Sequence, residues 1–447
     1  MSELRCYPDY KDSGVPWLGE IPSHWDEKRM RFFINTNPLK SELDVADDTM
    51  VSFLPMEALN IGGGMNLETD KEISEVYKGY TYFRNEDVVI AKITPCFENG
   101  KASISENLTN GIGFGTTELH VLRPKDGAIS KFIFYLIRSD SFMKIGESEM
   151  YGAGGQKRIP ESFIKNFLGA LPPLDEQQAI VNFLDTELEH IDTLISRQQQ
   201  LIEKLAEQRS AVITHAVTKG LDLDVPMKDS GIEWLGDMPE HWKATKLKYY
   251  FDIQLGKMLQ PNPSLSDDFE VNYLKAMHVQ WDDTKVIDLP KMWCNERELE
   301  KYQVYDGDLL VCEGGEVGRS ALIRGLEGTT IIQNALHRLR STDAGDVRYL
   351  NYVIRHIADS EWFSILCNKA TIAHLTGDKL ANTFITLPPL SEQLDIIDHL
   401  DSQTKKIDEM SDSNKSIIAK LQEYRSALIT QAVTGKIDVR HINKKAS

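Results

Sequence analysis

The sequence predicts an α/β fold in which two mixed α+β heads are separated by two long antiparallel coiled-coil helices. Three observations predict it: two blocks of sequence occur twice, one of these blocks has no Pro or Gly over a long stretch, and its apolar residues have helical spacing. The 447 residues are therefore interpreted as two copies of a unit of about 217 residues, related by a pseudo-twofold axis.

The duplication rests on two blocks. Residues 11–25 read KDSGVPWLGEIPSHW and recur at 228–242 as KDSGIEWLGDMPEHW, with ten of 15 positions identical. Residues 171–220 recur without a gap at 387–436, with 23 of 50 positions identical. The intervening segments have nearly equal lengths of 145 and 144 residues but match only in framework fragments. The two intervening segments therefore share a framework but differ in most of their residues. This indicates two domains with the same function and different specificities.

The repeat divides the chain into six segments, in which each unit has a lead-in, a head and a helix block. We expect lead-in 1–25, head 26–170, helix block 171–225, lead-in 226–242, head 243–386 and helix block 387–447.

Each helix block begins with a Pro-Pro pair that ends an extended segment. Asp175 is predicted to cap the first helix with Gln178 completing a capping box, whereas the second copy keeps only Ser391 as a cap.

Roughly 40 residues without Pro or Gly give each helix a length on the order of 60 Å. An isologous arrangement of the two equivalent units makes the helices antiparallel. The alternative is that each helix packs only on its own head.

Apolar residues in alternating steps of four and three predict a coiled-coil seam. Gln198 and Asn414 interrupt it at equivalent positions, where polar residues fix register at some cost in stability, and Arg209 and Arg425 also fall on it. The seam residues are Leu184, Leu188, Ile191, Ile195, Ile202, Leu205 and Val212 in the first copy, and Leu400, Ile407, Ile418, Leu421 and Leu428 in the second.

Composition excludes several classes of protein. A net charge of −18 argues against a histone-like or RNA-coating protein, but the heads carry only −4 and −3, so basic groups can cluster locally on them. The longest strongly apolar stretch, 132–137, is too short to span a bilayer, and no apolar core follows the N-terminus. Five scattered cysteines without a C-x-x-C pair suit a reducing compartment. We therefore expect a cytoplasmic protein with no membrane contact.

Three motifs, each present twice, resemble the specificity (S) subunit of type I restriction–modification enzymes over essentially the whole chain. They are W-L-G-x-x-P-x-H-W at 17–25 and 234–242, L-P-P-L-x-E-Q at 171–177 and 387–393, and R-S-A-x-I-T-x-A-V-T at 209–218 and 425–434. The resemblance implies that the heads are target-recognition domains that read the two halves of an asymmetric bipartite site in double-stranded DNA. It also implies helices that act as spacer and docking surface for two modification (methyltransferase) subunits, with restriction (motor-nuclease) subunits outside.

No catalytic motif accounts for the chain as an enzyme. It has no G-x-x-x-x-G-K-[ST] phosphate loop, no Asn/Asp-Pro-Pro-aromatic tetrapeptide of an adenine methyltransferase, and no His cluster with metal-ligand spacing. We expect a non-catalytic subunit without a cofactor of its own, and the resemblance implies S-adenosylmethionine, ATP and Mg in the partner subunits. The alternatives are a coiled-coil assembly scaffold with protein-binding heads and, with no motif in its favour, a free-standing methyltransferase or nuclease.

Candidate DNA-binding residues lie on glycine-containing loops with Gln, Lys or Arg, because amides read base edges while basic groups and backbone N–H groups hold phosphates. For each loop the alternative is an ordinary surface loop, and for His278 and Asn334 a satisfied structural side chain. The candidates are Lys92, Thr94, Lys101, Gly154, Gly155, Gln156, Lys157 and Arg158 in the first head, and Lys257, Gln260, His278, Gly314, Gly315, Arg319 and Asn334 in the second.

The repeated aromatic and histidine residues of the lead-ins are interpreted as partner-docking or packing residues. They are Trp17, His24 and Trp25 in the first copy and Trp234, His241 and Trp242 in the second.

Overall fold

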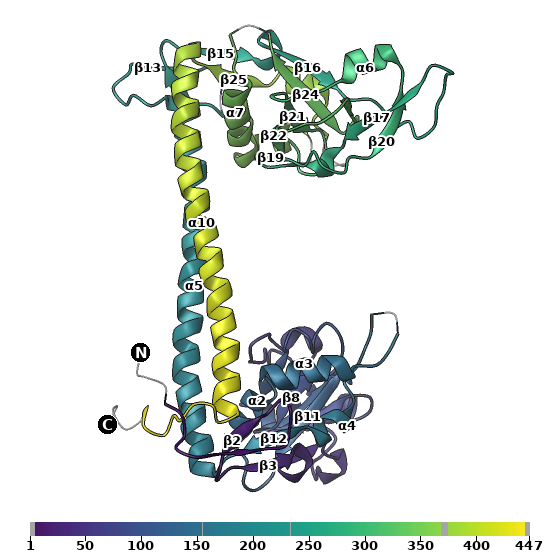
Figure 1. The fold of residues 1–447 in the computed structure, drawn as a ribbon, viewed down its shortest axis with the longest axis vertical. Coiled ribbons are helices and arrows are strands. Elements are labelled where there is room, and N and C mark those ends of the chain that lie inside the picture. The colour runs from purple at the N-terminus through teal and green to yellow at the C-terminus, as the bar shows by residue number, and fades with distance from the viewer. Residues whose placement is uncertain (1–4, 154, 233, 343, 368–373, 443–447) are drawn as a thin grey trace. The chain divides into compact units, whose positions relative to one another are not determined.

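The computed structural model describes residues 5–153, 155–232, 234–342, 344–367 and 374–442. The chain forms two compact units, one of residues 1–199 with 416–447 and the other of residues 200–415. Each unit contains one head, one lead-in hairpin, the beginning of one long helix and the end of the other (Figure 1). The predicted fold class, two α/β heads with two long helices, is confirmed.

The two lead-ins form the same hairpin. In each, an Asp side chain accepts the backbone N–H of a Gly two residues later at 2.9 Å, and that Gly has a positive φ that favours glycine: Asp12 with Gly14 and Asp229 with Gly231. The antiparallel strands are β1 (Tyr10–Asp12) with β2 (Glu20–Pro22), and β13 (Met227–Asp229) with β14 (Asp237–Pro239).

The first head is built on three sheets. Helix α2 packs on strands β8, β9 and β11, and its apolar residues join the largest core of this unit. One sheet is β4 (Ile34–Thr36), β11 (Leu119–Pro124), β8 (Val88–Ala91) and β9 (Ala102–Ile104); another is β6 (Asp70–Glu72), β5 (Met50–Leu54), β10 (Ile112–Gly115) and β7 (Thr81–Arg84); the third is β3 (Asp26–Arg29) with β12 (Leu168–Leu171). The helices are η1 (Met30–Phe32), η2 (Lys40–Glu42), η3 (Met56–Ala58), α1 (Ile73–Val76), η4 (Thr109–Gly111), α2 (Ser130–Leu136), α3 (Asp140–Glu149) and α4 (Glu161–Asn166).

The second head repeats this framework with different additions. Its four-stranded sheet has the same order as the sheet around β11, and its β17 pairs in parallel with β23 as β5 pairs with β10. The strands are β15 (Lys243–Lys246) with β25 (Phe384–Leu387); β16 (Phe251–Leu255), β24 (Leu336–Ser341), β21 (Leu309–Cys312) and β22 (Ser320–Leu322); β20 (Lys291–Cys294), β17 (Phe269–Leu274) and β23 (Thr330–Ile332); and β18 (Val279–Gln280) with β19 (Asp283–Thr284). The helices are η5 (Leu247–Tyr249), η6 (Ala276–His278), α6 (Glu296–Tyr302), α7 (Val347–Asp359), α8 (Trp362–Leu366) and α9 (Gly377–Ala381).

The long helices begin earlier than predicted. Helix α5 (Leu174–Lys219) has 46 residues and α10 (Leu390–Val433) has 44. The carbonyls of Pro173 and Pro389 already accept helical hydrogen bonds at 2.9 and 3.0 Å, so Asp175 and Ser391 lie inside the first turn and the prediction that they cap the helices is wrong. Within the described ranges, no helix is both long and apolar enough to cross a membrane.

The two helices run antiparallel in each unit, as predicted. In the first unit, buried α5 residues from Ile180 to Ile191 pack with Leu428 to Val433 of α10, and Asp192 pairs with Arg425 at 3.0 Å. In the second unit, Arg209 of α5 faces Asp408 of α10 at 3.4 Å. This second pair is the symmetric equivalent of the first, so the two arginines that interrupt the apolar seam are explained as cross-helix ion pairs.

Candidate DNA interface and docking surfaces

In each head, one of the loops predicted to bind DNA follows an equivalent central strand, β8 in the first head and β21 in the second. Each strand is preceded by a buried Asp that binds an Arg of the neighbouring strand through two hydrogen bonds. Asp87 accepts two from Arg123 at 2.7 Å, and Asp308 accepts two from Arg340 at 2.6 and 2.7 Å. Such bidentate pairs hold strand ends rigidly. The shared framework therefore fixes where the loops begin.

The structure brings the two predicted loops of the first head together. The backbone N–H of Thr94 donates to the Lys157 carbonyl at 3.0 Å, and the Thr94 hydroxyl donates to the Gly155 carbonyl at 2.6 Å. The Ile159 N–H donates to the Lys92 carbonyl at 2.8 Å. The two loops, about 60 residues apart in the chain, are therefore one surface, on which Gln156 and Lys157 are exposed. Gly154 lies outside the described residues.

Two of the predicted basic residues hold this surface together rather than stand free on it. The Arg158 guanidinium donates to both carboxylate oxygens of Glu118 at 2.9 and 2.8 Å and lowers the pKa of that carboxyl. The Lys101 ammonium donates to the Met56 carbonyl at 3.1 Å. Lys92 and Lys157 are the remaining cations of the predicted set.

In the second head, the loop after β21 is built around Arg319. Its guanidinium donates to the Ala276 carbonyl at 2.9 Å and to Glu316 at 3.3 Å. Gly315 has a φ of 76°, which favours glycine in this turn. Gly314 lies beside it and is half-buried. The Arg319 Nε is buried, and the described part of the chain offers it no hydrogen-bond acceptor. This arginine is thus incompletely satisfied at the position where the framework presents its variable loop.

The other candidates of the second head are held in internal networks. The Lys257 ammonium is buried and donates to Glu298 at 2.5 Å and to Gln260 at 2.8 Å, while Gln260 also donates to Asp268 at 2.8 Å. The backbone N–H of Asn334 donates to the Lys257 carbonyl at 2.9 Å. Lys257 and Gln260 are therefore left out of the contact set proposed below, whereas the half-buried Asn334 side chain stays in it.

The surroundings of His278 are those of a structural histidine. It is buried, its Nδ1 accepts the backbone N–H of Lys275 at 3.2 Å, and burial lowers its pKa, so the ring is neutral. This geometry matches the structural alternative considered for His278.

A further pair of histidines supports the loops from inside the heads. His120 and His337 are equivalent, and each donates through Nε2 to a carbonyl at the end of a loop, to that of Ile159 at 3.0 Å and that of Leu375 at 2.8 Å. Burial lowers the pKa of both rings.

Protonation of these histidines is expected to destabilise the heads. Because the folded pKa lies below the unfolded value of about 6.5, only the unfolded chain gains the proton as pH falls past that value, and stability is lost below it. We expect His337→Gln to flatten this loss in the second head, measured as hydrogen-exchange protection of β21 between pH 7 and 5. His190→Gln, at an exposed position on α5, is the control. An unchanged pH profile in His337→Gln would contradict the assignment.

In the first unit, the lead-in is fastened to the start of α5 by one buried carboxylate. Glu176 accepts hydrogen bonds from the Tyr7 hydroxyl at 3.1 Å, from His24 at 2.6 Å and from the Trp25 indole at 2.9 Å. Arg440 also lies 3.6 Å from it. Trp25 is fully buried, which favours packing over docking for this residue.

The second unit repeats this fastening only in part. His241 lies 2.8 Å from Glu392, but the Trp242 indole N–H is buried and finds no partner among the residues that the structure describes. Trp17 and Trp234 keep exposed surface beside further aromatic rings, Trp17 stacking on Phe167 with ring centroids 5.9 Å apart. The tryptophans at 17 and 234 and the two histidines therefore stay candidates for docking.

The Gln that ends each L-P-P-L-x-E-Q motif was not among the predicted site residues, although it follows each of these glutamates. Gln177 is fully buried, donates to the carbonyls of Gly127 and Pro172 at 2.8 and 2.9 Å, and accepts the Ile129 N–H at 2.9 Å. Gln393 makes the same three contacts in the second unit. The E-Q dipeptide of the repeated motif thus joins each helix to its lead-in and its head.

Comparison with known proteins decides the family. Residues 32–204 and 239–421 match the family described as Type I restriction modification DNA specificity domain, and together they make up more than half of the chain. The chain belongs to this family. The predicted resemblance to specificity subunits is confirmed.

Relatives of this specificity family resemble the chain over different extents. The chain is 37% identical over 239 residues to the EcoAI specificity subunit of a type I restriction enzyme from Escherichia coli, a match that covers 48% of this chain and 40% of that subunit. It is 27% identical to the EcoEI specificity subunit from the same species, over 88% of this chain and 79% of the relative.

Solved structures support the same fold. A chain from a structure of the type I R-M system, described for its complex assembly and conformational transition, is similar with a TM-score of 0.73 at 20% identity, covering 93% of this chain and 99% of that chain. The HsdS subunit from Thermoanaerobacter tengcongensis is similar with a TM-score of 0.55 at 19% identity, over 93% and 98%.

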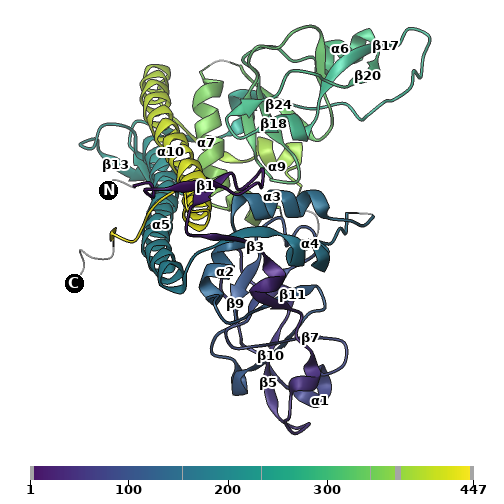
Figure 2. The ribbon, with the colours of Figure 1, turned by 60° about the horizontal axis from the view of Figure 1, so that its bottom comes forward.

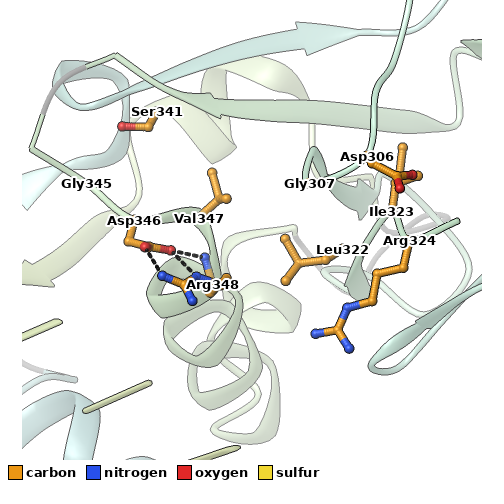
Figure 3. A pocket seen from close by; sticks show the side chains of 10 residues that line it. All are labelled: Asp306, Gly307, Leu322, Ile323, Arg324, Ser341, Gly345, Asp346, Val347 and Arg348. Atoms are coloured by element: carbon orange, nitrogen blue, oxygen red, sulfur yellow. Dashed lines mark hydrogen bonds and ion pairs between the residues drawn. The ribbon is translucent and has the colours of Figure 1, made fainter. Parts of the chain in front are cut away.

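The second specificity-domain head contains a pocket of about 450 Å³ (Figure 3). At its edge Asp346 accepts the backbone N–H of Arg348 at 2.8 Å and pairs with its guanidinium at 2.7 Å, so the two charges compensate each other. Arg324 lies on the opposite side. The lining does not include any predicted DNA-binding residue, so we do not place the DNA contacts here.

Proposed function

We propose that this chain is the DNA-recognition subunit of a type I restriction–modification complex and that it has no catalytic role of its own. Each head reads one half of an asymmetric bipartite site in double-stranded DNA. The observation that carries the proposal is the duplicated framework with divergent loops after β8 and β21. One scaffold that holds two different loop surfaces is what a reader of two unlike half-sites needs.

The proposed contacts follow the chemistry of the loops. In the first head the exposed Gln156 suits an adenine edge, while Lys157 and Lys92 suit phosphates. The hydrogen bonds of Thr94 to the neighbouring loop support a rigid surface. In the second head we propose Gly314, Gly315, Arg319 and Asn334, with the buried and unsatisfied Nε marking Arg319 as the central residue.

The partners are proposed from the duplication. Two equivalent lead-in surfaces fit two copies of the same partner, the modification (methyltransferase) subunits, with restriction subunits outside them. The half-exposed side chains of Trp17 and His24, and of Trp234 and His241, are the proposed contacts. S-adenosylmethionine, ATP and Mg are assigned to those partner subunits. The two helices set the spacing between the half-sites.

An exchange of heads tests the proposed function. Replacing residues 26–170 with the corresponding head of a relative of different specificity should change one half of the recognised sequence and leave the other half and the gap unchanged. The measurement is genome sequencing that detects methylated bases, in cells that express the chimera with its modification subunits. Exchange of residues 243–386 is the matched experiment and should change only the opposite half.

Other outcomes would contradict the proposal. Changes in both half-sites after one exchange would exclude independent heads. An unchanged methylation pattern after both exchanges, with the complex still assembled, would favour the alternative of an assembly scaffold whose heads bind proteins.

A further inference from the structure

A second basic surface, outside the predicted loops, is present in both heads. Residues 29–33 read Arg-Met-Arg-Phe-Phe, and residues 246–250 read Lys-Leu-Lys-Tyr-Tyr, 217 positions later. No position is identical, yet every position keeps its chemical type in segments that otherwise diverge. We call these two surfaces, each with the Asn described below, the basic turns.

The backbone of each basic turn is held in place by one buried apolar residue. Met30 and Leu247 begin the short helices η1 and η5, are completely buried, and donate their backbone N–H groups to the carbonyls of Phe167 and Thr383, each at 3.0 Å. Because the apolar residue between the two basic ones points inward, both cations are presented on the outside. Arg29, Arg31 and Lys248 are exposed, and Lys246 is half-buried.

In each turn the two cations share one neutral acceptor. Arg29 and Arg31 donate to the same side-chain oxygen of Asn166 at 3.0 and 2.9 Å. Lys246 and Lys248 share the equivalent oxygen of Asn382 at 3.5 and 2.9 Å. In the part of the chain that the structure describes, none of the four cations has a carboxylate within 4.0 Å.

In the first head, the two acidic residues that precede the basic turn in the chain are already paired with other cations. Asp26 pairs with Lys28 at 2.8 Å and Glu27 lies 3.4 Å from Lys11, while the Lys125 ammonium adds a positive charge by donating to the Arg31 carbonyl at 2.6 Å. Two like charges held close together without a counterion repel each other, and an anion placed between them relieves that repulsion. The arrangement fits a phosphate.

An exposed aromatic ring accompanies the outer cation in both turns. The side chains of Phe32 and Tyr249 are 63% and 64% exposed, and they lie 5.2 and 5.5 Å from the charged groups of Arg31 and Lys248. This cation–π contact holds a long basic side chain in place without neutralising its charge. The pair is thus positioned in advance rather than free to fold onto an acidic neighbour.

Each basic turn lies one short helix away from the loop surface assigned to DNA. In the first head, the loop that ends at Arg158 leads into α4, whose last residue is Asn166, and α4 lies beside η1 and β3 (Figure 2). In the second head, the Leu375 N–H donates to the Glu313 carbonyl of the loop after β21 at 2.7 Å, and α9 leads from there to Asn382. The six residues of α4 and the five of α9 span about 8 to 9 Å, or two to three base pairs at 3.4 Å each.

We propose that the two basic turns are phosphate anchors, which grip the DNA backbone two to three base pairs from the bases read by the adjacent loop. This rests on the proposed function. Because phosphates are the same in every sequence, the anchors add affinity without changing which bases are read.

Salt dependence of DNA binding tests the anchors. The complex with its modification subunits is titrated onto a random-sequence duplex and onto a duplex containing its methylated site. The logarithm of the association constant K falls linearly with the logarithm of the salt concentration. In the double variant Arg29→Gln with Arg31→Gln, this slope should become about 1.8 less steep, and both duplexes should bind about ten-fold more weakly. Lys246→Gln with Lys248→Gln should do the same, and Arg29→Lys with Arg31→Lys should keep the slope.

The control is Lys144→Gln, which removes a charge from an exposed pair on α3 and should leave the slope unchanged. An unchanged slope in both double variants overturns the proposal. Loss of modification subunits from the variant complex, with an unchanged slope in what still assembles, also overturns it and makes the surface a protein contact. Failure of the unsubstituted complex to prefer its site would instead refute the proposed function.

Discussion

Glu176→Ala is expected to destabilise the first unit by about 3 kcal/mol, because it leaves buried donors without an acceptor. The carboxylate is the common partner of the Trp25 indole, the Tyr7 hydroxyl and His24. Burial, with the Glu176 charge as the next cause, raises the pKa of Tyr7 well above its ordinary range, so this hydroxyl stays a donor. An alanine supplies no acceptor for either buried group.

The matched variant is Glu392→Ala at the equivalent position of the second unit. Its carboxylate pairs with a half-exposed His241, and the Trp242 N–H has no partner to lose in the described part of the chain. The loss in unfolding free energy of the second unit should therefore stay below about 1 kcal/mol. Hydrogen exchange of β8 and β21 reports the stability of each unit separately and needs no two-state assumption. Equal losses of unfolding free energy in the two variants would contradict the proposed difference between Glu176 and Glu392.

The framework could be predicted from sequence because the duplication compares the chain with itself. Residues kept in both copies are those that every unit needs: the lead-in, the helix start and the helix end. The residues that these repeated residues contact could not be predicted, since Glu176, for example, contacts residues about 150 positions away in the chain. The helix starts were predicted too late because the proline carbonyls accept the first helical bonds, which a cap prediction based on side chains ignores.

The candidate interface was predictable only in part for a related reason. Loop composition indicated where glycine and basic residues gather, and the structure places two of those loops in contact through Thr94. Composition does not show which cation already has an acidic partner. Arg158 is bound by Glu118 and Lys257 by Glu298. The cations of the basic turns, which have no carboxylate partner among the described residues, were overlooked.

A signal for the basic turns was nevertheless present in the sequence. Comparing the heads by identity hides them, since Arg29 aligns with Lys246 and Phe32 with Tyr249. A comparison by charge and size reveals five consecutive matched positions. If the two heads read DNA as proposed, surfaces with conserved chemistry and no identity indicate a contact that both heads make, whereas fully divergent loops indicate the bases that each head reads.

Lengthening both long helices is expected to widen the gap between the two half-sites. An insertion near Gly220 is unsuitable, because that residue follows the end of α5, where a Cβ would meet Trp242 at 3.2 Å and where the Val217 carbonyl accepts a hydrogen bond from Thr386. An insertion there would disturb the second head. After Gln199 in α5 and after Lys415 in α10, the helices are continuous and the positions are equivalent.

Three heptads, or 21 residues, inserted at both positions add about 32 Å and preserve the apolar seam. This is close to one turn of duplex, 34–36 Å for 10–10.5 base pairs, so the heads would meet the same face of the DNA. The methylated sites of the variant should therefore keep both half-sites and gain about nine or ten base pairs between them. Insertion into α5 alone is the control and should abolish methylation, because it shifts the antiparallel seam out of register. If the doubly lengthened protein kept the original gap, the helices would not be the element that measures it, and the spacing would have to come from the partner subunits.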